Sequence, residues 1–386
     1  MLSRRLPPHA EVNALTRALS ARRARGQSIV DLTESNPTRA AIVYPPDLLK
    51  ELASAPALHY APQALGLDVA RAAVAHDQTR RGVDVDAGRV VLTASTSEAY
   101  AWLFKLLCDP GNAVLVPRPS YPLFEHLTQL ESVESVPFNL EYHGRWEIDL
   151  TSLQGAPANT RALIVVSPNN PTGSYLTAPE VDRLCAICRD RGWALIVDEV
   201  FADYPLEVDA PLTDIAARAD VPTFTLGGLS KTAGLPQLKL GWIVVGGPPA
   251  ACSAALAGLE LIGDSFLSVN TPVQIAARQF LERGAAIRTQ IHDRVKGNLG
   301  ALRQTAKQFP ACDVLKVEGG WSAVIRVPAT RTEEQLILAL LDGEGILVHP
   351  GYFFDFAHEA FVVVSLLVTP DVFHDAIARV MRFATS

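Results

Sequence analysis

One lysine of the chain has surroundings that suit covalent chemistry. Lys231 lies in Ser230-Lys-Thr232, between the glycine pair Gly227-Gly228 and a Gly-Leu-Pro turn, on a tight loop after an apolar run. Burial lowers the pKa of a lysine toward that of a usable nucleophile, and a nucleophilic lysine can form a Schiff base. The alternative is an ordinary solvated loop lysine. The assignment therefore depends on the other polar segments of the chain.

A second segment has the features of an anion-binding site. The apolar run 90–94 is followed by Ser95-Thr96-Ser97, and a helix is predicted from there to Leu107. Backbone N–H groups and the helix dipole converge at a helix N-terminus, where they bind anions such as phosphate. Ser95 with Glu98 also fits an ordinary helix cap, and both interpretations can hold together.

Three further side chains follow apolar runs in the same way. Tyr121 stands in a proline-rich turn, and Asn170 lies in the loop Ser167-Pro-Asn-Asn-Pro-Thr-Gly173. Such a density of proline, asparagine and glycine predicts a loop of fixed shape. Asp198 ends a continuous apolar run. An aspartate there is either a helix-capping residue or a functional carboxylate in a medium of low dielectric constant.

Apolar strands that alternate with helices must position these residues. The predicted strands are 90–94, 113–116, 163–166, 193–199, a segment ending at residue 226, and 240–245. Strands that are apolar throughout indicate a mainly parallel sheet covered by helices on both faces. Ligands bind such sheets at the carboxyl ends of the strands. We therefore expect Ser95, Tyr121, Asn170, Asp198 and Lys231 to gather at that edge.

The composition is that of a globular protein that acts on small molecules. The 386 residues, 48% of them hydrophobic, suffice for about two domains. A net charge of −7, with basic residues only in short pairs, argues against a nucleic-acid partner. No apolar run approaches the roughly 18 residues of a membrane span, and the N-terminus lacks the core of a signal peptide. We expect no membrane partner and a cytoplasmic location.

The cysteines point the same way. Five cysteines in a chain of this length fit a reducing compartment. Cys185-Ala-Ile-Cys188 has a metal-like spacing, but the two cysteines recur at helical intervals with apolar neighbours and no second pair completes a zinc set. We therefore expect core cysteines and no metal site.

In order and spacing these segments resemble the pyridoxal-phosphate enzymes of the aspartate aminotransferase fold (fold type I), specifically the class I/II aminotransferases. The most specific pieces are Asn169-Asn-Pro-Thr-Gly173, Val197-Asp-Glu-Val200, and Ser230-Lys-Thr232 with Lys239-Leu-Gly-Trp242 after it. The resemblance covers nearly the whole chain.

The resemblance implies an α/β fold with two domains. A large domain, residues 46–270, would hold a mainly parallel seven-stranded sheet with helices on both faces. An N-terminal arm and a smaller α/β domain would be formed by residues 1–45 and 271–386.

It also implies roles for the polar residues. Lys231 would carry pyridoxal 5′-phosphate as a Schiff base and move a proton, and Asp198 would pair with the ring nitrogen of the cofactor. Asn170 would contact its phenolic oxygen and Tyr121 its ring. Its phosphate would be bound by Ser95, Thr96, Ser97 and Lys239, and by Tyr60 of the neighbouring subunit. The resemblance thus implies a homodimeric aminotransferase with shared active sites. It would exchange an amino group between an amino acid or amine and a 2-oxo acid by a ping-pong mechanism.

Three positions near the cofactor depart from the family pattern. Phe201 stands where a tyrosine usually donates to the phenolic oxygen, so Tyr204 or another group would have to substitute. Gly228 replaces a phosphate-binding serine. Lys239 replaces an arginine, which exchanges a bidentate contact for a point charge.

A fourth departure concerns the substrate. In the strand Phe361-Val-Val-Val-Ser365, Val363 occupies the position of the arginine that usually clamps the substrate carboxylate. Candidate replacements are Arg39, Arg326, His349 and Tyr352. The missing anchor leaves open a pyridoxal-phosphate lyase or decarboxylase on the same scaffold.

A third hypothesis is a cofactor-binding sensory domain of a transcription regulator. It requires a DNA-binding domain of about 70 residues before the region of resemblance. That region begins near residue 10, so we do not expect this role.

Overall fold

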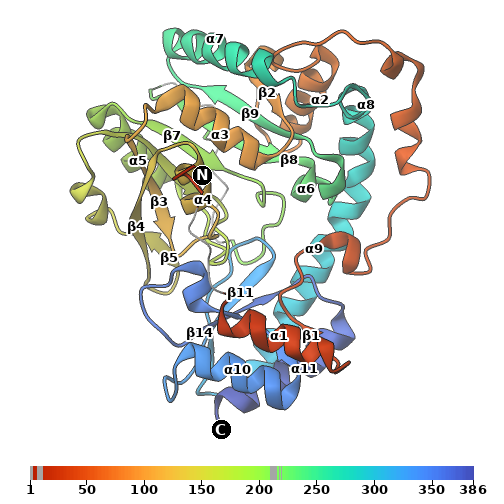
Figure 1. The fold of residues 1–386 in the computed structure, drawn as a ribbon, viewed down its shortest axis with the longest axis vertical. Coiled ribbons are helices and arrows are strands. Elements are labelled where there is room, and N and C mark those ends of the chain that lie inside the picture. Colours follow the sequence, from red (N-terminus) through yellow and green to blue (C-terminus); the bar gives the residue numbers. More distant parts are fainter. Residues whose placement is uncertain (1–2, 7–11, 209–214, 217, 219) are drawn as a thin grey trace.

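Strands that are mostly apolar form the centre of a large sheet in the computed structural model (Figure 1), which describes residues 3–6, 12–208, 215–216, 218 and 220–386. Residues 1–2 and 7–11 of the expected arm lie outside that part. The strands are β2 (Val90–Thr93), β3 (Ala113–Arg118), β4 (Glu134–Tyr142), β5 (Trp146–Ile148), β6 (Thr160–Val166), β7 (Ala194–Asp198), β8 (Thr223–Gly228) and β9 (Gly241–Gly246).

The order of the strands is β2-β9-β8-β7-β6-β3-β4-β5. From β8 to β4 all neighbours are parallel, whereas β9, β2 and β5 run antiparallel to their partners. The predicted mainly parallel sheet is thus confirmed, and the short β5 adds an antiparallel edge strand. Because β3, β6, β7 and β8 are parallel, their carboxyl ends lie at one edge of the sheet.

Helices cover both faces of this sheet, as predicted. One face packs against α3 (Thr96–Leu107), α4 (Phe124–Leu130) and α7 (Pro249–Phe266), and the other against α5 (Ala178–Arg191). The ends of α5 are encoded locally. Thr177 and Glu180 form a capping box at its start, and Gly192 ends it with φ 68°, a left-handed conformation that glycine adopts easily. Cys185 and Cys188 are buried on the inner side of α5, as expected.

The C-terminal part forms smaller sheets. The order β10 (Asp313–Val314), β11 (Ser322–Arg326), β14 (Phe361–Ser365), β13 (His349–Pro350) makes an antiparallel sheet, and β1 (Val30–Asp31) pairs in parallel with β12 (Ile346–Leu347). Helix α2 (Asp68–Thr79) packs against β2, and the remaining helices are α1 (Ala14–Ala24), α6 (Leu229–Thr232), α8 (Thr271–Ile275), α9 (Ala277–Ala306), α10 (Glu333–Glu344) and α11 (Pro370–Ala384).

Figure 1 shows how these parts are arranged: α9 runs along one side from the region of the large sheet to that of the small sheets, and α1 and β1 lie beside α10 and α11. The N-terminal segment therefore joins the C-terminal part of the chain. Among the helices that the structure describes, none has the length and apolar character needed to cross a membrane.

Candidate active site

The loop that carries Lys231 is shaped by close packing of β8 against β9. A Cβ atom on Gly227 would lie 2.4 Å from the indole nitrogen of Trp242, and one on Gly228 would lie 3.2 Å from the carbonyl oxygen of Leu240. Gly227 is therefore required by this packing, and a Cβ atom at position 228 would be a tight fit. Lys231 follows in the single turn of α6, at the carboxyl end of β8.

Asp198 ends β7, the strand next to β8, and is only 8% exposed. Its Oδ2 accepts a hydrogen bond of 3.0 Å from the hydroxyl group of Tyr100 on α3, and its Oδ1 accepts one of 3.1 Å from the backbone N–H of Val200. Both donors hold the carboxylate in one orientation. The bond from Val200 is a local capping contact, whereas the bond from Tyr100 joins Asp198 to a distant helix.

The two charged groups have shifted proton affinities. Burial raises the pKa of Asp198 to about 6, although the bonds from Val200 and Tyr100 and the charge of Lys231 work against the increase. Burial lowers the pKa of Lys231 to about 8, and the negative charge of Asp198 opposes that change. In both cases desolvation of the charged form is the larger cause. Perturbed groups of this kind, brought together at a strand edge, mark a candidate catalytic centre.

Aromatic rings enclose the amine of Lys231. Its Nζ lies 4.5 Å from the ring centre of Trp321 and 5.2 Å from that of Phe201. Tyr204 is fully buried, and its hydroxyl group donates a hydrogen bond of 2.5 Å to the carbonyl oxygen of Lys231. Tyr204 therefore supports the backbone of the lysine turn and does not replace the hydroxyl group that Phe201 lacks.

The segment that is predicted to bind an anion forms the start of α3. Ser95 caps the helix by accepting a bond of 3.2 Å from the backbone N–H of Glu98, as the alternative interpretation expected, and Thr96 and Ser97 form the first turn. A Cβ atom on Gly241 would lie 2.9 Å from the backbone of Ser95. The glycine thus lets this helix end sit directly against β9. The first-turn N–H groups of a helix have no acceptor within it, so the site can bind an anion.

The loop after β6 contains a buried asparagine, Asn169, and a partly exposed one, Asn170. Asn169 is 3% exposed; its amide donates to the carbonyl oxygen of Pro119 at 3.0 Å, and its Oδ1 accepts from Ser120 at 3.1 Å. These bonds join the loop to the turn that carries Tyr121. Asn170 is partly exposed, and its Oδ1 accepts a bond of 3.3 Å from the hydroxyl group of Ser322 on β11.

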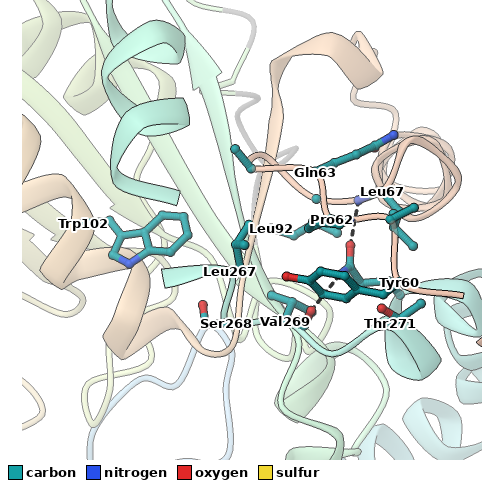
Figure 2. A pocket seen from close by; sticks show the side chains of 14 residues that line it. Tyr60, Pro62, Gln63, Leu67, Leu92, Trp102, Leu267, Ser268, Val269 and Thr271 are labelled. Carbon is teal, nitrogen blue, oxygen red and sulfur yellow. Dashed lines mark hydrogen bonds between the residues drawn. The ribbon is translucent and has the colours of Figure 1, made fainter. Parts of the chain in front are cut away.

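Three predicted site residues lie at the surface. Tyr121 is 49% exposed, and Lys239 is exposed with φ 53° just before β9. Tyr60 is 80% exposed and lines the same pocket as Ser268 and Thr271 (Figure 2). The hydroxyl group of Ser268 in turn bonds the carboxylate of Glu98 on α3 at 2.9 Å. Because Tyr121, Lys239 and Tyr60 are exposed, a ligand or a second subunit can contact them.

The strand position that lacks an arginine lies in an apolar cluster. Val363 is 1% exposed and packs with Trp146, Leu315, Val324 and Phe354. An arginine at this place would bury a guanidinium group among apolar side chains.

The four candidates differ in what they could offer to a substrate carboxylate. His349 pairs with Val363 across β13 and β14, and burial lowers its pKa to about 4, so it is neutral at pH 7. Arg326 forms an ion pair of 2.6 Å with Asp313. Arg39 is exposed on a short 3-10 turn, and Tyr352 is 47% exposed.

Sequence reasoning missed three residues that the structure adds to the site. Tyr100 positions Asp198, Asn169 holds the loop of Asn170, and Trp321 covers Lys231. A signal existed for two of them. Tyr100 is the one hydroxyl-bearing residue in the otherwise apolar segment 99–104, and Trp321 follows the glycine pair Gly319-Gly320.

Comparison with known proteins is consistent with this geometry. Residues 27–380 match the family model described as "Aminotransferase class I and II". Glutamate-pyruvate aminotransferase AlaA of Escherichia coli K12 is 26% identical over 360 residues, which cover 90% of this chain and 88% of that protein. Nicotianamine aminotransferase 1 of Oryza sativa subsp. japonica is 33% identical over 213 residues, 54% of this chain but only 42% of the rice protein.

Solved structures show the same fold. An aminotransferase from Escherichia coli superimposes with a TM-score of 0.86 at 24% identity, with 100% of this chain and 98% of that chain covered.

Proposed function

The chain belongs to the class I and II aminotransferases, a family and fold that depend on pyridoxal phosphate in general, and on this premise we propose that Lys231 holds that cofactor. The enzyme transfers an amino group between an amino acid or amine and a 2-oxo acid. The observation that carries the proposal is the pair of buried groups, Lys231 and Asp198, at the carboxyl ends of neighbouring strands. Neither the comparisons nor the geometry favours a lyase or decarboxylase.

The chemistry of the side chains fits this cofactor. Lys231 offers an amine for the aldehyde, Asp198 a buried carboxylate for the ring nitrogen, and Asn170 an amide for the phenolic oxygen. Tyr121 would lie against the ring. The phosphate would be held by Ser95, Thr96 and Ser97 at the start of α3, with Lys239 as a further cation and Tyr60 reaching across from a second subunit.

When bound, the cofactor accepts the electron pair left at the substrate Cα after a proton is removed. Lys231 is placed to take and return that proton, because its lowered pKa lets the amine lose its own proton closer to neutral pH. Asp198 holds a negative charge that stabilises a protonated ring nitrogen, and Tyr100 keeps that carboxylate in position. The rings of Phe201 and Trp321 cover one side of the amine.

We also propose the domain division expected from the sequence: residues 46–270 as the large domain, and residues 1–45 with 271–386 as the arm and small domain. The pairing of β1 with β12 supports it, because it attaches the N-terminal segment to the C-terminal part. We place the enzyme in the cytoplasm, which is supported by five cysteines that are all free thiols.

The first test concerns the amino donor. The name of the Escherichia coli relative suggests alanine and glutamate as substrates to try. The side chains that pack on Val363 are apolar, and a charge-assisted hydrogen bond contributes about 1.5–3 kcal/mol. The side chain of aspartate or glutamate carries a second carboxylate that would need a further cation, so we expect alanine to react with kcat/KM at least about tenfold above that of either. The half-reaction is followed by the change in cofactor absorbance, with product analysis for the oxo acid.

The panel includes an amine of similar size as the matched comparison. A donor site without a carboxylate clamp should accept the amine nearly as well as the amino acid. Efficient turnover of aspartate or glutamate would show that a cation reaches the site from elsewhere. Release of carbon dioxide in place of an oxo acid would support the decarboxylase.

The second test concerns the homodimer that we propose. The surface around Tyr60 exposes large apolar side chains, which suits a subunit interface; they are Leu58 (87%), Tyr60 (80%), Leu261 (73%) and Phe266 (54%). If Tyr60 completes the site of the partner, a heterodimer of Tyr60→Ala and Lys231→Ala has one site with both changes and one intact site. When the two inactive variants are mixed in equal amounts and exchange subunits, half of the dimers are mixed, and each of these has one intact site. About a quarter of wild-type activity should therefore return.

The stoichiometry is checked by analytical ultracentrifugation. No recovery despite proven exchange would mean that each Tyr60 serves its own chain. A fully active monomer would contradict the interface altogether.

A further inference from the structure

Two aromatic rings from distant parts of the chain meet over the amine of Lys231. Nζ lies 4.5 Å from the ring centre of Trp321 and 5.2 Å from that of Phe201. The two rings meet edge to face, with centres 5.3 Å apart and an angle of 73°. A cation over an aromatic face is attracted by the electron-rich ring, more strongly where water is excluded and most strongly by tryptophan.

Trp321 is fixed from both sides. It is 3% exposed and packs on Tyr204 with ring centres 5.1 Å apart. The preceding Gly320 donates a backbone bond of 3.0 Å to Tyr204, and the carbonyl oxygen of Trp321 accepts one of 2.7 Å from Leu366. Its indole N–H is buried without a hydrogen-bond partner among the described residues. The contacts of its ring, rather than a bond to its nitrogen, therefore hold the indole in place.

The charged groups near this amine come from several elements. Asp198 on β7 attracts the ammonium form, and Tyr100 on α3 orients that carboxylate. Arg288 on α9 is positive and donates a bond of 2.9 Å to the carbonyl oxygen of Thr232, the residue after the lysine. The hydroxyl group of Tyr204 is engaged by the carbonyl oxygen of Lys231. Burial favours the neutral amine, whereas the rings and Asp198 favour its ammonium form.

A further ion pair lies on the far side of Asp198. Glu199 bonds Arg81 of the segment after α2 at 2.6 Å, and its charge raises the pKa of Asp198. Since this glutamate is neutralised by its own partner, Asp198 is the carboxylate that acts on Lys231 directly.

We propose that Trp321 is a positioning residue for Lys231: its ring face, together with that of Phe201, holds the ammonium form of the side chain in place. Because Trp321 directly precedes β11, the small sheet thereby influences how readily the amine releases its proton. The proposal relies on the proposed function only in taking Lys231 as the reactive amine. The contact itself can be measured in the protein without cofactor.

The experiment lowers the electron density of the Trp321 ring and leaves its shape nearly unchanged. Cofactor-free protein is produced with tryptophan or with mono-, di- and trifluorinated tryptophan, and acetic anhydride labelling of Lys231 is measured against pH by peptide mass spectrometry. Fluorine withdraws electrons from the ring, so the ammonium form loses stabilisation. We expect the labelling profile of Lys231 to move to lower pH with each fluorine. The rate at pH 7 should rise by about threefold to tenfold across the series, as a cation–π contact of this kind predicts.

The matched control is Trp321→Phe, produced with the same fluorinated tryptophans. Four of the five tryptophans of the chain remain in it, so effects of fluorine elsewhere appear there too. We expect no movement of the Lys231 profile in this background, or in Trp321→Tyr should the phenylalanine variant fail to fold. The labelling of the exposed Lys307 in the same samples should stay constant.

An unchanged Lys231 profile across the fluorinated series would refute the proposal. So would an equal movement in the Trp321→Phe background. Either outcome leaves the aminotransferase assignment intact, because the labelling does not depend on turnover.

Discussion

Lys231→Ala will lose nearly all transamination while keeping the fold. Removing a group that transfers the proton costs about 10²–10⁴-fold in turnover, and the covalent hold on the cofactor is lost as well. Lys231 is the lysine that combines burial, a lowered pKa and a neighbouring buried carboxylate. Borohydride reduction of the wild-type holoenzyme, followed by peptide mapping, should place the cofactor label on the peptide that contains Lys231.

The matched control is Lys307→Ala, on the exposed surface just after α9, where the amine bonds only Gln304 at 3.0 Å. This variant should keep full activity and leave the label on Lys231. A label on another lysine, or a Lys231→Ala protein with near-normal turnover, would overturn the assignment of the catalytic residue.

Asp198→Ala should fold but lose about 10²–10³-fold in kcat, the cost of removing one preorganised electrostatic partner. The carboxylate is 8% exposed and is held by Tyr100 and Val200, so water cannot replace it in the same geometry. Steady-state kinetics with the best donor of the panel measure the loss. Asp190→Ala, an exposed change near the end of α5, is the control and should have no effect.

The same carboxylate predicts a pH dependence of stability. Its pKa in the folded protein, about 6, lies above the usual value of 3.8 because burial disfavours the charge. Folding thus favours the protonated form of Asp198. The stabilisation that this form gives to the folded protein is complete below pH 4 and is lost as pH rises through 6. In cofactor-free protein we expect the free energy of unfolding to decrease over this range by on the order of 2 kcal/mol. Asp198→Asn should lack the decrease, and chemical denaturation at several pH values measures it.

Normal turnover in Asp198→Ala would mean that the residue serves only to hold the end of β7. An identical pH dependence in wild type and Asp198→Asn would mean that other groups control stability in this range.

The sequence by itself determined the central sheet and most of the positions at its edge. β6, β7 and β8 lie between covering layers, so almost every residue in them is apolar, and their ends are marked by the polar residue or glycine that follows. The start and end of α5 are also encoded by the local sequence, because Thr177 and Gly192 lie at the two ends and cap their own helix. Asp198 and Lys231 could be found in this way.

The strands β4 and β5 escaped this kind of reasoning. β4 contains Pro137 and has a mixed pattern of burial, because one side of the strand pairs with β3 and only the three-residue β5 pairs with the other. A strand with such a mixed pattern does not differ clearly in sequence from a loop.

Only the tertiary structure decided which distant residues act on the buried pair. Tyr100 and Asp198 are separated by 98 positions, and Trp321 reaches Lys231 from a different sheet. Local patterns encode period and exposure, whereas such contacts depend on how whole layers pack. The same holds for the neutral His349 and the enclosed Val363. Both owe their state to burial by side chains from other segments, and no local pattern records that burial.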